Sequence, residues 1–522
     1  MARITPVSLA RFLAPLALLW VACGTAPGDA MPPGPVDGGT RYLPDGAVAT
    51  DSGVSPDGGT TTGDGSVTPP PPTDGGSPVT DAGTPMGRGP RLYDPPTTSG
   101  GIWTRNNPMF ISGLTPSMGN PPADFVRTYF DDFGANAVHL WQDALPTEAQ
   151  GWNAHRPGAP YVAWTNAAGR SSGHGPQTLG GVAVAAPGRI GYQVSDEPRN
   201  MDDLLAMEAG VRSVRAMDPD ALIIINFGSV DDGGDPGTGS LLDRMIQYTV
   251  DHNLADVLSH DSYTMRRGQY RWLEHMRTVA LAHDLPNWRY LMSYTEPGRD
   301  RATESDLRWH TNVGLVYGYT GHSWFLYQIG GGHSGLATTL FERTGDFSSP
   351  RSADFAWAAR HNRELATIGP ILTQLRSTGV RYVASELFGV EVGRPDGTRD
   401  FAPGAGGDSY LVGIDASGAS LGQHALVGFF EDDWGERYLM VQNPNHSNGT
   451  RPTDSTSEAT ITLTFDFSSA PAGMNRNRLE RFDPSTGAVS DLTLSGNDLA
   501  LRVAAGEIVF MKYKTGAPWA GR

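Results

Sequence analysis

The chain has 522 residues, of which 39% are hydrophobic and 18% charged, so it can form one large domain and a smaller second one. Its formal net charge is −17 at pH 7, and its pI is about 5.1. Nucleic-acid binding needs a basic surface that neutralises phosphates, so we expect no nucleic-acid partner. The single cysteine, Cys23, excludes an intramolecular disulfide and a cysteine-based zinc site.

Residues 1–22 have the pattern of a secretory signal. Arg3 and Arg11 are followed by an apolar run that ends at residue 22, shorter than the roughly 20 residues of a membrane-spanning helix. The sequence Leu-Trp-Val-Ala-Cys at residues 19–23 resembles the end of a bacterial lipoprotein signal peptide. The resemblance implies a lipid on Cys23 and an extracytoplasmic protein anchored at the outer membrane or cell surface. An ordinary cleaved signal with an incidental cysteine is the alternative.

Residues 23–90 have a low-complexity composition, dominated by Gly, Pro, Asp, Thr and Ser, with a single aromatic residue, Tyr42. Such a segment cannot bury enough apolar surface to offset the entropy lost on ordering. We therefore expect a disordered linker that holds the folded part away from a membrane.

Beyond residue 91, short apolar segments alternate with amphipathic ones. Strands are predicted at residues 109–112, 137–141, 161–164, 190–194, 222–227, 257–260, 290–294 and 323–327. Helices are predicted at residues 122–132, 201–217, 240–253, 270–283, 305–316 and 352–377. Mostly apolar strands of this length are typical of parallel strands that are buried on both faces.

This alternation predicts an α/β fold in which eight strands close into a (β/α)₈ TIM barrel over residues 91–378. The connection between the third and fourth strands is rich in Pro and Gly and poorly helical, so a doubly wound open sheet is the alternative. Residues 379–522 instead show short alternating segments separated by turn signals. They predict a C-terminal antiparallel β-sandwich.

A glutamate followed by proline comes directly after two of the predicted strands. The fourth strand leads into Asp196-Glu197-Pro198, and the seventh leads into Glu296-Pro297. In TIM barrels the catalytic groups lie at the C-terminal ends of the strands. Glu-Pro also suits the first turn of a helix, so either glutamate alone could have a capping role.

Glutamates after strands four and seven are the arrangement of the clan A glycoside hydrolases, and the chain resembles these barrels, including the family 42 β-galactosidases. The resemblance implies a retaining hydrolase of poly- or oligosaccharides, with Glu197 as general acid/base and Glu296 as nucleophile. Retention requires the two carboxyls about 5 to 5.5 Å apart with opposite protonation. Where the clan has an asparagine that contacts the sugar 2-hydroxyl, this chain has Asp196. This departure leaves open a glycan-binding protein without hydrolytic activity.

Polar and aromatic residues near the ends of the other strands are candidates for substrate binding. Sugars offer C–H faces that stack on aromatic rings and hydroxyl groups that need polar partners. The candidates are Trp141, Asp143, Trp164, Asp261, Tyr263, His322 and Trp324. By resemblance to the clan, Trp324 forms the floor of the non-reducing sugar subsite, and Tyr263 is expected to orient the nucleophile. The alternative for the tryptophans and Tyr263 is that they pack in the core. If the strand count is off by one, the second catalytic carboxylate would be Asp143 or Asp261.

We expect neither a cofactor nor a catalytic metal. His260, Asp261, His322 and His333 could meet at the rim, but no His-x-His or His-Glu-x-x-His spacing occurs. Glycines 330–332 lack the strand, fingerprint and helix of a phosphate-binding loop. The two Gly-x-Ser-x-Gly matches do not lie between a predicted strand and helix. A carbohydrate partner and a monomeric protein remain the expectation.

Overall fold

The computed structural model describes residues 90–522 except 116–120, 141–147, 166–186, 195, 229–234, 264–267, 296–300, 329–335, 385, 388–389, 392–393, 418–423 and 448–457. Residues 81–522 form one compact unit. Four residues with predicted roles lie outside the described part of the chain: Cys23, Trp141, Asp143 and Glu296.

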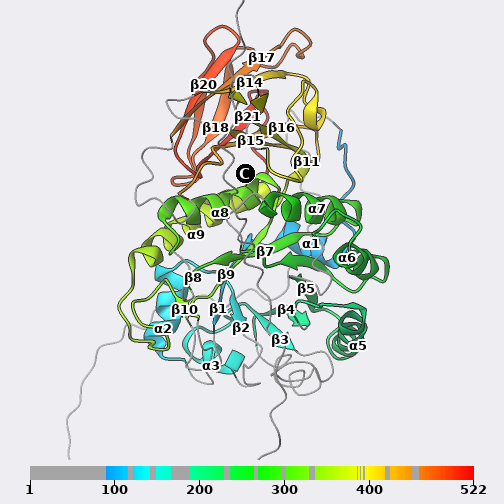
Figure 1. Cartoon of the computed structure of the whole chain (residues 1–522), viewed down its shortest axis with the longest axis vertical. Coiled ribbons are helices and arrows are strands. Elements are labelled where there is room, and N and C mark those ends of the chain that lie inside the picture. Colours follow the sequence, from blue (N-terminus) through cyan, green and yellow to red (C-terminus); the bar gives the residue numbers. More distant parts are fainter. Residues whose placement is uncertain are drawn as a thin grey trace, which may run out of the picture. The chain divides into compact units, whose positions relative to one another are not determined.

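Parallel strands close into an eight-stranded barrel in chain order (Figure 1). The strands are β1 (Phe110–Thr115), β2 (Val138–Leu140), β3 (Tyr161–Thr165), β4 (Arg189–Val194), β5 (Leu222–Phe227), β6 (Val257–His260), β7 (Asn287–Met292) and β9 (Gly321–Phe325). Ser323 of β9 lies opposite both Tyr290 of β7 and Ser112 of β1, which completes the ring. The predicted TIM barrel is confirmed, and the alternative of an open doubly wound sheet is wrong.

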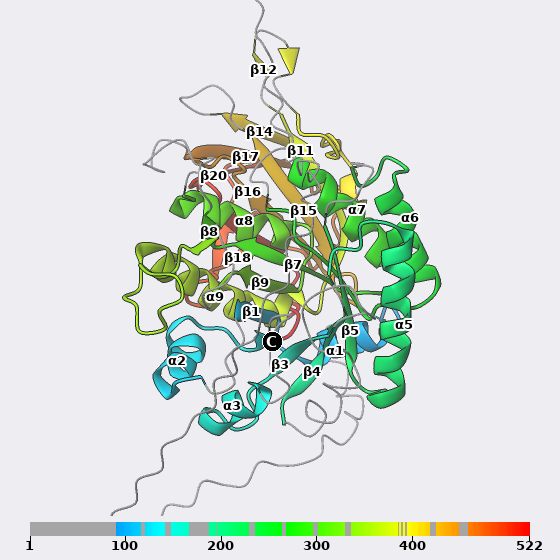
Figure 2. The same cartoon turned by 60° about the horizontal axis from the view of Figure 1, so that its bottom comes forward.

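Helices pack around the barrel, and Figure 2 shows α5, α6 and α7 along one side of it. The described helices are α1 (Ser99–Asn106), α2 (Ala123–Arg127), α3 (Glu148–His155), α5 (Met201–Met217), α6 (Leu241–Asp251), α7 (Gly268–Ala282), α8 (Glu304–Val316) and α9 (Ala353–Leu372). Capping boxes fix where two of them begin. Ser240 and Asp243 cap α6, and Thr303 and Asp306 cap α8, each pair satisfying backbone N–H groups of the first turn.

Two parts of the predicted pattern need correction. The helix expected over residues 352–377 ends at Leu372, and Arg376 already begins the first strand of the next domain. The seventh and eighth barrel strands begin earlier than expected, at Asn287 and Gly321. Their first residues are polar or small, so a search for apolar runs places the start of each strand too late.

The C-terminal part is an antiparallel β-sandwich, as predicted. A six-stranded sheet has the order β11-β15-β16-β21-β18-β19, and a three-stranded sheet has the order β14-β17-β20. The strands are β11 (Arg376–Val383), β14 (Leu411–Ser417), β15 (Ala425–Glu431), β16 (Arg437–Gln442), β17 (Ala459–Phe465), β18 (Arg478–Phe482), β19 (Val489–Thr493), β20 (Asp498–Val503) and β21 (Ile508–Tyr513). Two short antiparallel pairs complete the described strands: β8 (Tyr294–Thr295) with β10 (Ala337–Thr338), and β12 (Glu386–Leu387) with β13 (Val390–Glu391).

The sandwich has its own apolar core and contacts helix α8 of the barrel. Side chains alternate between buried and half-buried along β17, as expected for a strand with one face toward the core. The Ser305 and Ser447 hydroxyls lie 2.9 Å apart, and the Asn312 side chain donates to the Gly506 carbonyl at 3.0 Å. Among the described residues, no helix has the length and apolar character needed to cross a membrane.

The barrel interior changes from apolar to polar along the strands. Phe110 stacks on Trp288 with ring centroids 4.1 Å apart, in a cluster with interior residues of β3, β5 and β6. Two residues further along their strands, on the same face, Phe110 is followed by Ser112 and Trp288 by Tyr290. The apolar layer therefore closes the barrel, and the polar layer above it supports the C-terminal end, where the candidate site lies.

Candidate active site

An open cavity of about 540 Å³ lies at the C-terminal ends of the barrel strands. It is lined by residues from β1, β3, β4, β5, β6, β7 and β9 or from the positions just after these strands: Leu114, Trp164, Asp196, Glu197, Asn226, Asp261, Tyr263, Tyr290 and Phe325. Among the described lining residues, three are carboxylic acids and none has a basic side chain. The cavity therefore combines acidic groups with apolar and aromatic walls.

Glu197 is held by an unusual backbone conformation directly after β4. Its φ of +40° lies in the left-handed region, which is uncommon for residues other than glycine. Its N–H donates to the Asn226 carbonyl at 3.1 Å, so the neighbouring strand β5 fixes this turn. The absent side chain of Gly228 leaves room for the carboxyl group, since a Cβ atom there would lie 2.2 Å from Glu197 Oε1. Such strain is concentrated at functional sites in proteins.

Asp196 accepts hydrogen bonds from two side chains of neighbouring strands. Its Oδ1 accepts from Gln193 Nε2 at 3.0 Å and from Asn226 Nδ2 at 2.9 Å. Asn226 is oriented in turn by Ser259, whose hydroxyl donates to Asn226 Oδ1 at 3.0 Å. Burial raises the pKa of Asp196 well above its usual range, the charge of Glu197 adds to this effect, and the hydrogen bond from Asn226 opposes it. Asp196 is thus held in place as the acceptor of two side-chain hydrogen bonds.

Asp261 follows β6 and forms a carboxyl pair with Glu197. Its N–H donates to the Phe227 carbonyl at 3.2 Å, and its side chain lines the same cavity as Glu197. Burial raises the pKa of Asp261 well above its usual range, and the charges of Glu197 and Asp196 add to this effect. Asp261 therefore keeps its proton to a higher pH than an exposed aspartate does.

A hydrogen-bond network inside the barrel supports these acids from below. The Tyr290 hydroxyl donates to Gln193 Oε1 at 2.7 Å and lies 3.3 Å from the His139 ring nitrogens. The Ser323 hydroxyl lies 3.5 Å from His139 Nδ1. Burial lowers the pKa of His139 to about 3, while a hydrogen bond with Gln193 opposes the shift. His139 is therefore neutral near pH 7 and acts as a hydrogen-bonding partner rather than as a charge.

Aromatic rings form one wall of the cavity. The Tyr263 ring lies 5.3 Å from that of Phe325, and both rings contact Tyr294 at centroid distances of 5.4 and 5.3 Å. Phe325 and Tyr263 are half-buried, and Trp164 lines the cavity from β3. Exposed ring faces beside polar acceptors suit a sugar ring, which has both C–H faces and hydroxyl groups.

The structure brings five of the sequence-predicted site residues together in the cavity: Trp164, Asp196, Glu197, Asp261 and Tyr263. Counting strands around the closed barrel places Glu197 after the fourth strand. Glu296 directly follows β8, the short strand after the seventh barrel strand, and lies itself outside the described residues together with Trp141 and Asp143.

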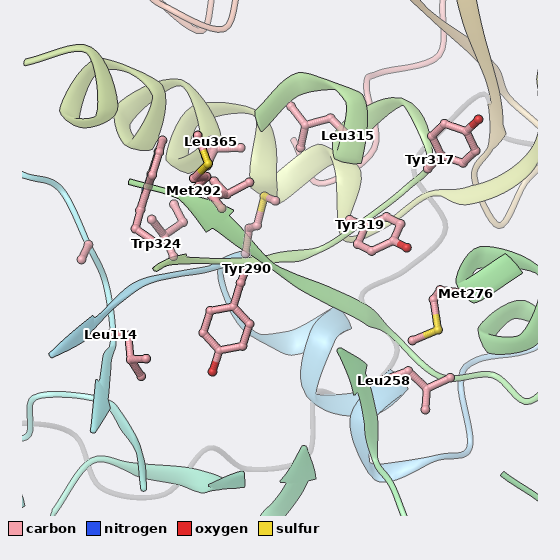
Figure 3. Packing of buried hydrophobic residues seen from close by; sticks show 14 of the residues in the cluster. Leu114, Leu258, Met276, Tyr290, Met292, Leu315, Tyr317, Tyr319, Trp324 and Leu365 are labelled. Atoms are coloured by element: carbon pink, nitrogen blue, oxygen red, sulfur yellow. The ribbon is translucent and has the colours of Figure 1, made fainter. Parts of the chain in front are cut away.

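The expectation that Trp324 and His322 contact substrate is corrected by the structure. Along β9 these two side chains point outward, because Ser323 and Phe325 occupy the inward positions. Trp324 is fully buried, and its indole N–H donates to Asn362 of α9 at 2.8 Å. Figure 3 shows Tyr290 and Trp324 extending to opposite sides of the sheet, with Trp324 directed toward the helix that carries Leu365.

His322 lies beneath helix α8, where Gly314 leaves space for its ring. A Cβ atom on Gly314 would lie 2.9 Å from His322 Nε2. Burial and the charge of Arg289 lower the pKa of His322 well below its usual value, so the ring is neutral. Within the described part of the chain, no three or more His, Cys, Asp or Glu residues are grouped so that they could hold a metal ion.

Five residues of this site were not predicted from the sequence: Leu114, Gln193, Asn226, Tyr290 and Phe325. Gln193 and Asn226 are polar residues inside otherwise apolar strands, and both are fully buried. A buried polar residue in such a strand needs a partner, so this pattern is a usable signal. The choice between Trp324 and Phe325 depends on strand register, which the sequence does not fix.

No protein-family model matches the sequence, and no curated protein is similar to it in sequence. Among solved structures, a β-galactosidase from the Antarctic haloarchaeon Halorubrum lacusprofundi matches at 12% identity with a TM-score of 0.34, covering 50% of this chain and 58% of that one. An endo-β-1,3-glucanase of glycoside hydrolase family 128 from Amycolatopsis mediterranei, in complex with laminaritriose, matches at 14% identity with a TM-score of 0.33, covering 48% and 98%. CelM2, a bifunctional glucanase-xylanase from a metagenome library, matches at 11% identity with a TM-score of 0.35, covering 78% and 99%. These distant structural neighbours are glycoside hydrolases, and the chain spans less than two-thirds of the length of the β-galactosidase.

Proposed function

We propose that this protein is a retaining glycoside hydrolase that cleaves O-glycosidic bonds of a poly- or oligosaccharide. The observation that carries the proposal is the position of Glu197, which follows the fourth strand of a closed barrel and lies in an open acidic and aromatic cavity. Glu296 follows the seventh strand in the sequence, so both glutamates occupy the positions of the clan A catalytic pair.

The proposed reaction has two displacements at the anomeric carbon. In the first, a Glu296 carboxylate oxygen forms a bond to this carbon while the bond to the glycosidic oxygen breaks, and Glu197 gives its proton to the leaving oxygen. In the second, Glu197 removes a proton from water, whose oxygen attacks the anomeric carbon and releases Glu296. The product keeps the anomeric configuration, and both glutamates return to their starting protonation states.

The carboxyl cluster suits this role of Glu197 because a general acid must hold a proton near neutral pH. Asp261 and Asp196 add two further acidic groups at the cavity that Glu197 lines. Adjacent acids in a partly enclosed space resist simultaneous ionisation. We assign Asp261 as a positioning residue, whose raised pKa favours a protonated carboxyl beside Glu197.

A second candidate function is glycan binding without hydrolysis. It is favoured by Asp196, since this residue occupies the position of the asparagine found in clan A enzymes and accepts hydrogen bonds from both Gln193 and Asn226. An ionised carboxylate can only accept a hydrogen bond from a sugar 2-hydroxyl, whereas an asparagine amide can also donate one. The two functions differ in one measurable property, the release of new reducing ends.

The deciding experiment incubates the purified protein with a panel of β-linked glucans, galactans, xylans and mannans and measures reducing ends. Activity in the wild type that is lost in both Glu197→Gln and Glu296→Gln supports hydrolysis. The matched control is Glu208→Gln, a glutamate of α5 that pairs with Arg212. Proton NMR of the first product anomer tests retention. Binding without any release of reducing ends would favour the second function, and activity that survives Glu296→Gln would refute the assigned nucleophile.

The proposal includes export and anchoring of the protein. Residues 1–22 would be removed, Cys23 would carry lipid, and residues 23–90 would form the tether that separates a monomeric catalytic part from the membrane. The test is fractionation of cells that express the wild type or Cys23→Ser. The wild type is expected in the membrane fraction and the variant in the soluble extracytoplasmic fraction. Equal partition of the two proteins would contradict the lipid anchor.

A further inference from the structure

A second cavity lies at the opposite end of the barrel from the carboxyl cluster. Its volume, counted together with the space open to solvent, is about 810 Å³. Its lining comes from the segment before α1, from α1, from the loops that lead into β7 and β9, and from the start of β11. These loops lie at the N-terminal ends of the barrel strands. The cavity therefore cannot take part in chemistry at the other end.

Four polar atoms that line this cavity have no hydrogen-bond partner among the residues that the structure describes. They are Thr104 Oγ1, Asn287 Oδ1, Thr320 Oγ1 and Ser377 Oγ. Each of these residues is more than nine-tenths buried. Buried polar side chains in proteins nearly always have partners, so four without one around a single cavity require an explanation.

The charged groups of the cavity are largely occupied by other partners. Arg277 makes two hydrogen bonds to Glu274, at 2.7 and 2.8 Å. Arg105 donates to Asp433 at 3.0 Å and to the Gln374 carbonyl at 2.6 Å. These two arginines are therefore not available to hold an anion. A third, Arg376, is exposed at the cavity, with its guanidinium over the Tyr93 ring at 5.6 Å, and stands against the two exposed acids of the rim.

The remaining features of the lining favour a neutral ligand. The rim carries two exposed acids, Asp94 and Asp284, which would repel an anion entering the cavity. Tyr93 and Tyr317 supply aromatic surface. The three unpartnered hydroxyls can each donate and accept, and Asn287 Oδ1 can only accept.

We propose that this cavity is a second binding site that takes a neutral polyhydroxylated ligand, a single sugar unit. A pyranose offers hydroxyl groups that both donate and accept, as the four unpartnered atoms require, and an apolar face that suits the tyrosines. A cluster of ordered waters is the competing occupant, because water also satisfies buried hydroxyls.

The test measures binding of D-glucose, D-galactose and D-mannose to the full-length protein by saturation-transfer NMR and by the shift in melting temperature with sugar concentration. D-Glucuronate serves as the anionic comparison. All measurements use the Glu197→Gln background, so that turnover does not interfere. The cavity variant is Thr320→Val with Ser377→Ala, and the control is Thr367→Val, a threonine on the exposed side of α9.

We expect at least one neutral sugar to bind, D-glucuronate to bind more weakly, and the cavity variant to lose about tenfold in affinity while the control does not. Ser377→Ala alone provides the test if the double variant does not fold. Two outcomes would overturn the proposal: no neutral sugar binds, or the cavity variant binds as the control does. Hydrolysis of glycans is measured separately, so failure of this second site leaves the proposed catalytic function untouched.

Discussion

The side chains of Glu197 and Asp261 line one cavity at the C-terminal end of the barrel, although one follows β4 and the other β6. Strand β5 lies between them and fixes both residues, since the Glu197 N–H donates to the Asn226 carbonyl and the Asp261 N–H donates to the Phe227 carbonyl. Two backbone hydrogen bonds to adjacent residues of one strand thus bring two acids together. The charge of Glu197 contributes to the raised pKa of Asp261, which links the geometry of the site to its pH dependence.

Replacing Glu197 with Gln removes the proton donor and preserves the shape of the side chain. We expect kcat to fall by roughly 10² to 10⁴-fold on the most active glycan of the panel, because general acid–base catalysis contributes about this much. Binding of the same glycan should persist. Initial rates and equilibrium binding measured on the same preparations check both statements. An unchanged kcat would show that Glu197 is not the general acid/base.

Asp261→Asn removes a negative charge next to Glu197 and leaves a side chain of the same shape. Asp261 has a raised pKa and asparagine cannot ionise, so the alkaline limb of the kcat/KM profile should move in the variant. Profiles of wild type and variant over the same pH range measure the displacement. A purely structural role for Asp261 would lower kcat/KM at all pH values without moving the limb.

The same substitution should change the pH dependence of stability. Burial raises the pKa values of Asp196 and Asp261 above their unfolded-state values near about 4. A carboxyl with a raised folded-state pKa contributes stability that is complete below the unfolded-state pKa and is lost as pH rises through the folded-state pKa. Asp261→Asn should therefore raise the free energy of unfolding by about 1 kcal/mol at about pH 8, and by less at about pH 4. Denaturant unfolding at the two pH values tests this, and an equal effect at both would contradict it.

Gly228→Ala should impair catalysis by displacing Glu197. The added Cβ would lie 2.2 Å from Oε1 and 2.5 Å from the carboxyl carbon, so the carboxyl group must move. Gly228 lies outside the left-handed region, and alanine is therefore acceptable to the backbone there. We expect a loss of kcat of about a hundredfold, since small misplacements of catalytic groups cost this much. Gly268→Ala is the matched control, because a Cβ at Gly268 meets nothing within 4 Å. Equal activity of the two variants would refute the expected displacement.

Substitution of Trp324 should affect stability, whereas substitution of Phe325 should affect substrate binding. Trp324→Phe removes the indole hydrogen bond to Asn362, so the free energy of unfolding should fall by about 1 to 3 kcal/mol while KM stays unchanged. Phe325→Ala removes part of the cavity wall and should raise KM. Thermal unfolding and steady-state kinetics of both variants check the contrast. A raised KM in Trp324→Phe would indicate that Trp324 contacts the substrate.

The sequence by itself determined the barrel, the sandwich and the strand that precedes each glutamate. Alternation of apolar strands with amphipathic helices has few architectural solutions, and catalytic groups of such barrels gather at one end. Asp196, Glu197 and Asp261 could therefore be named from their positions after strands.

Only the tertiary structure decided which face of each strand points inward. A one-residue change of register exchanges the two faces, so Phe325 lies at the cavity and Trp324 in the core, although they are neighbours in the chain. The raised pKa of Asp261 likewise depends on its burial and on the charge of Glu197, which follows a different strand. Sequence patterns report local periodicity, whereas a pKa depends on burial and on charges that the fold brings together.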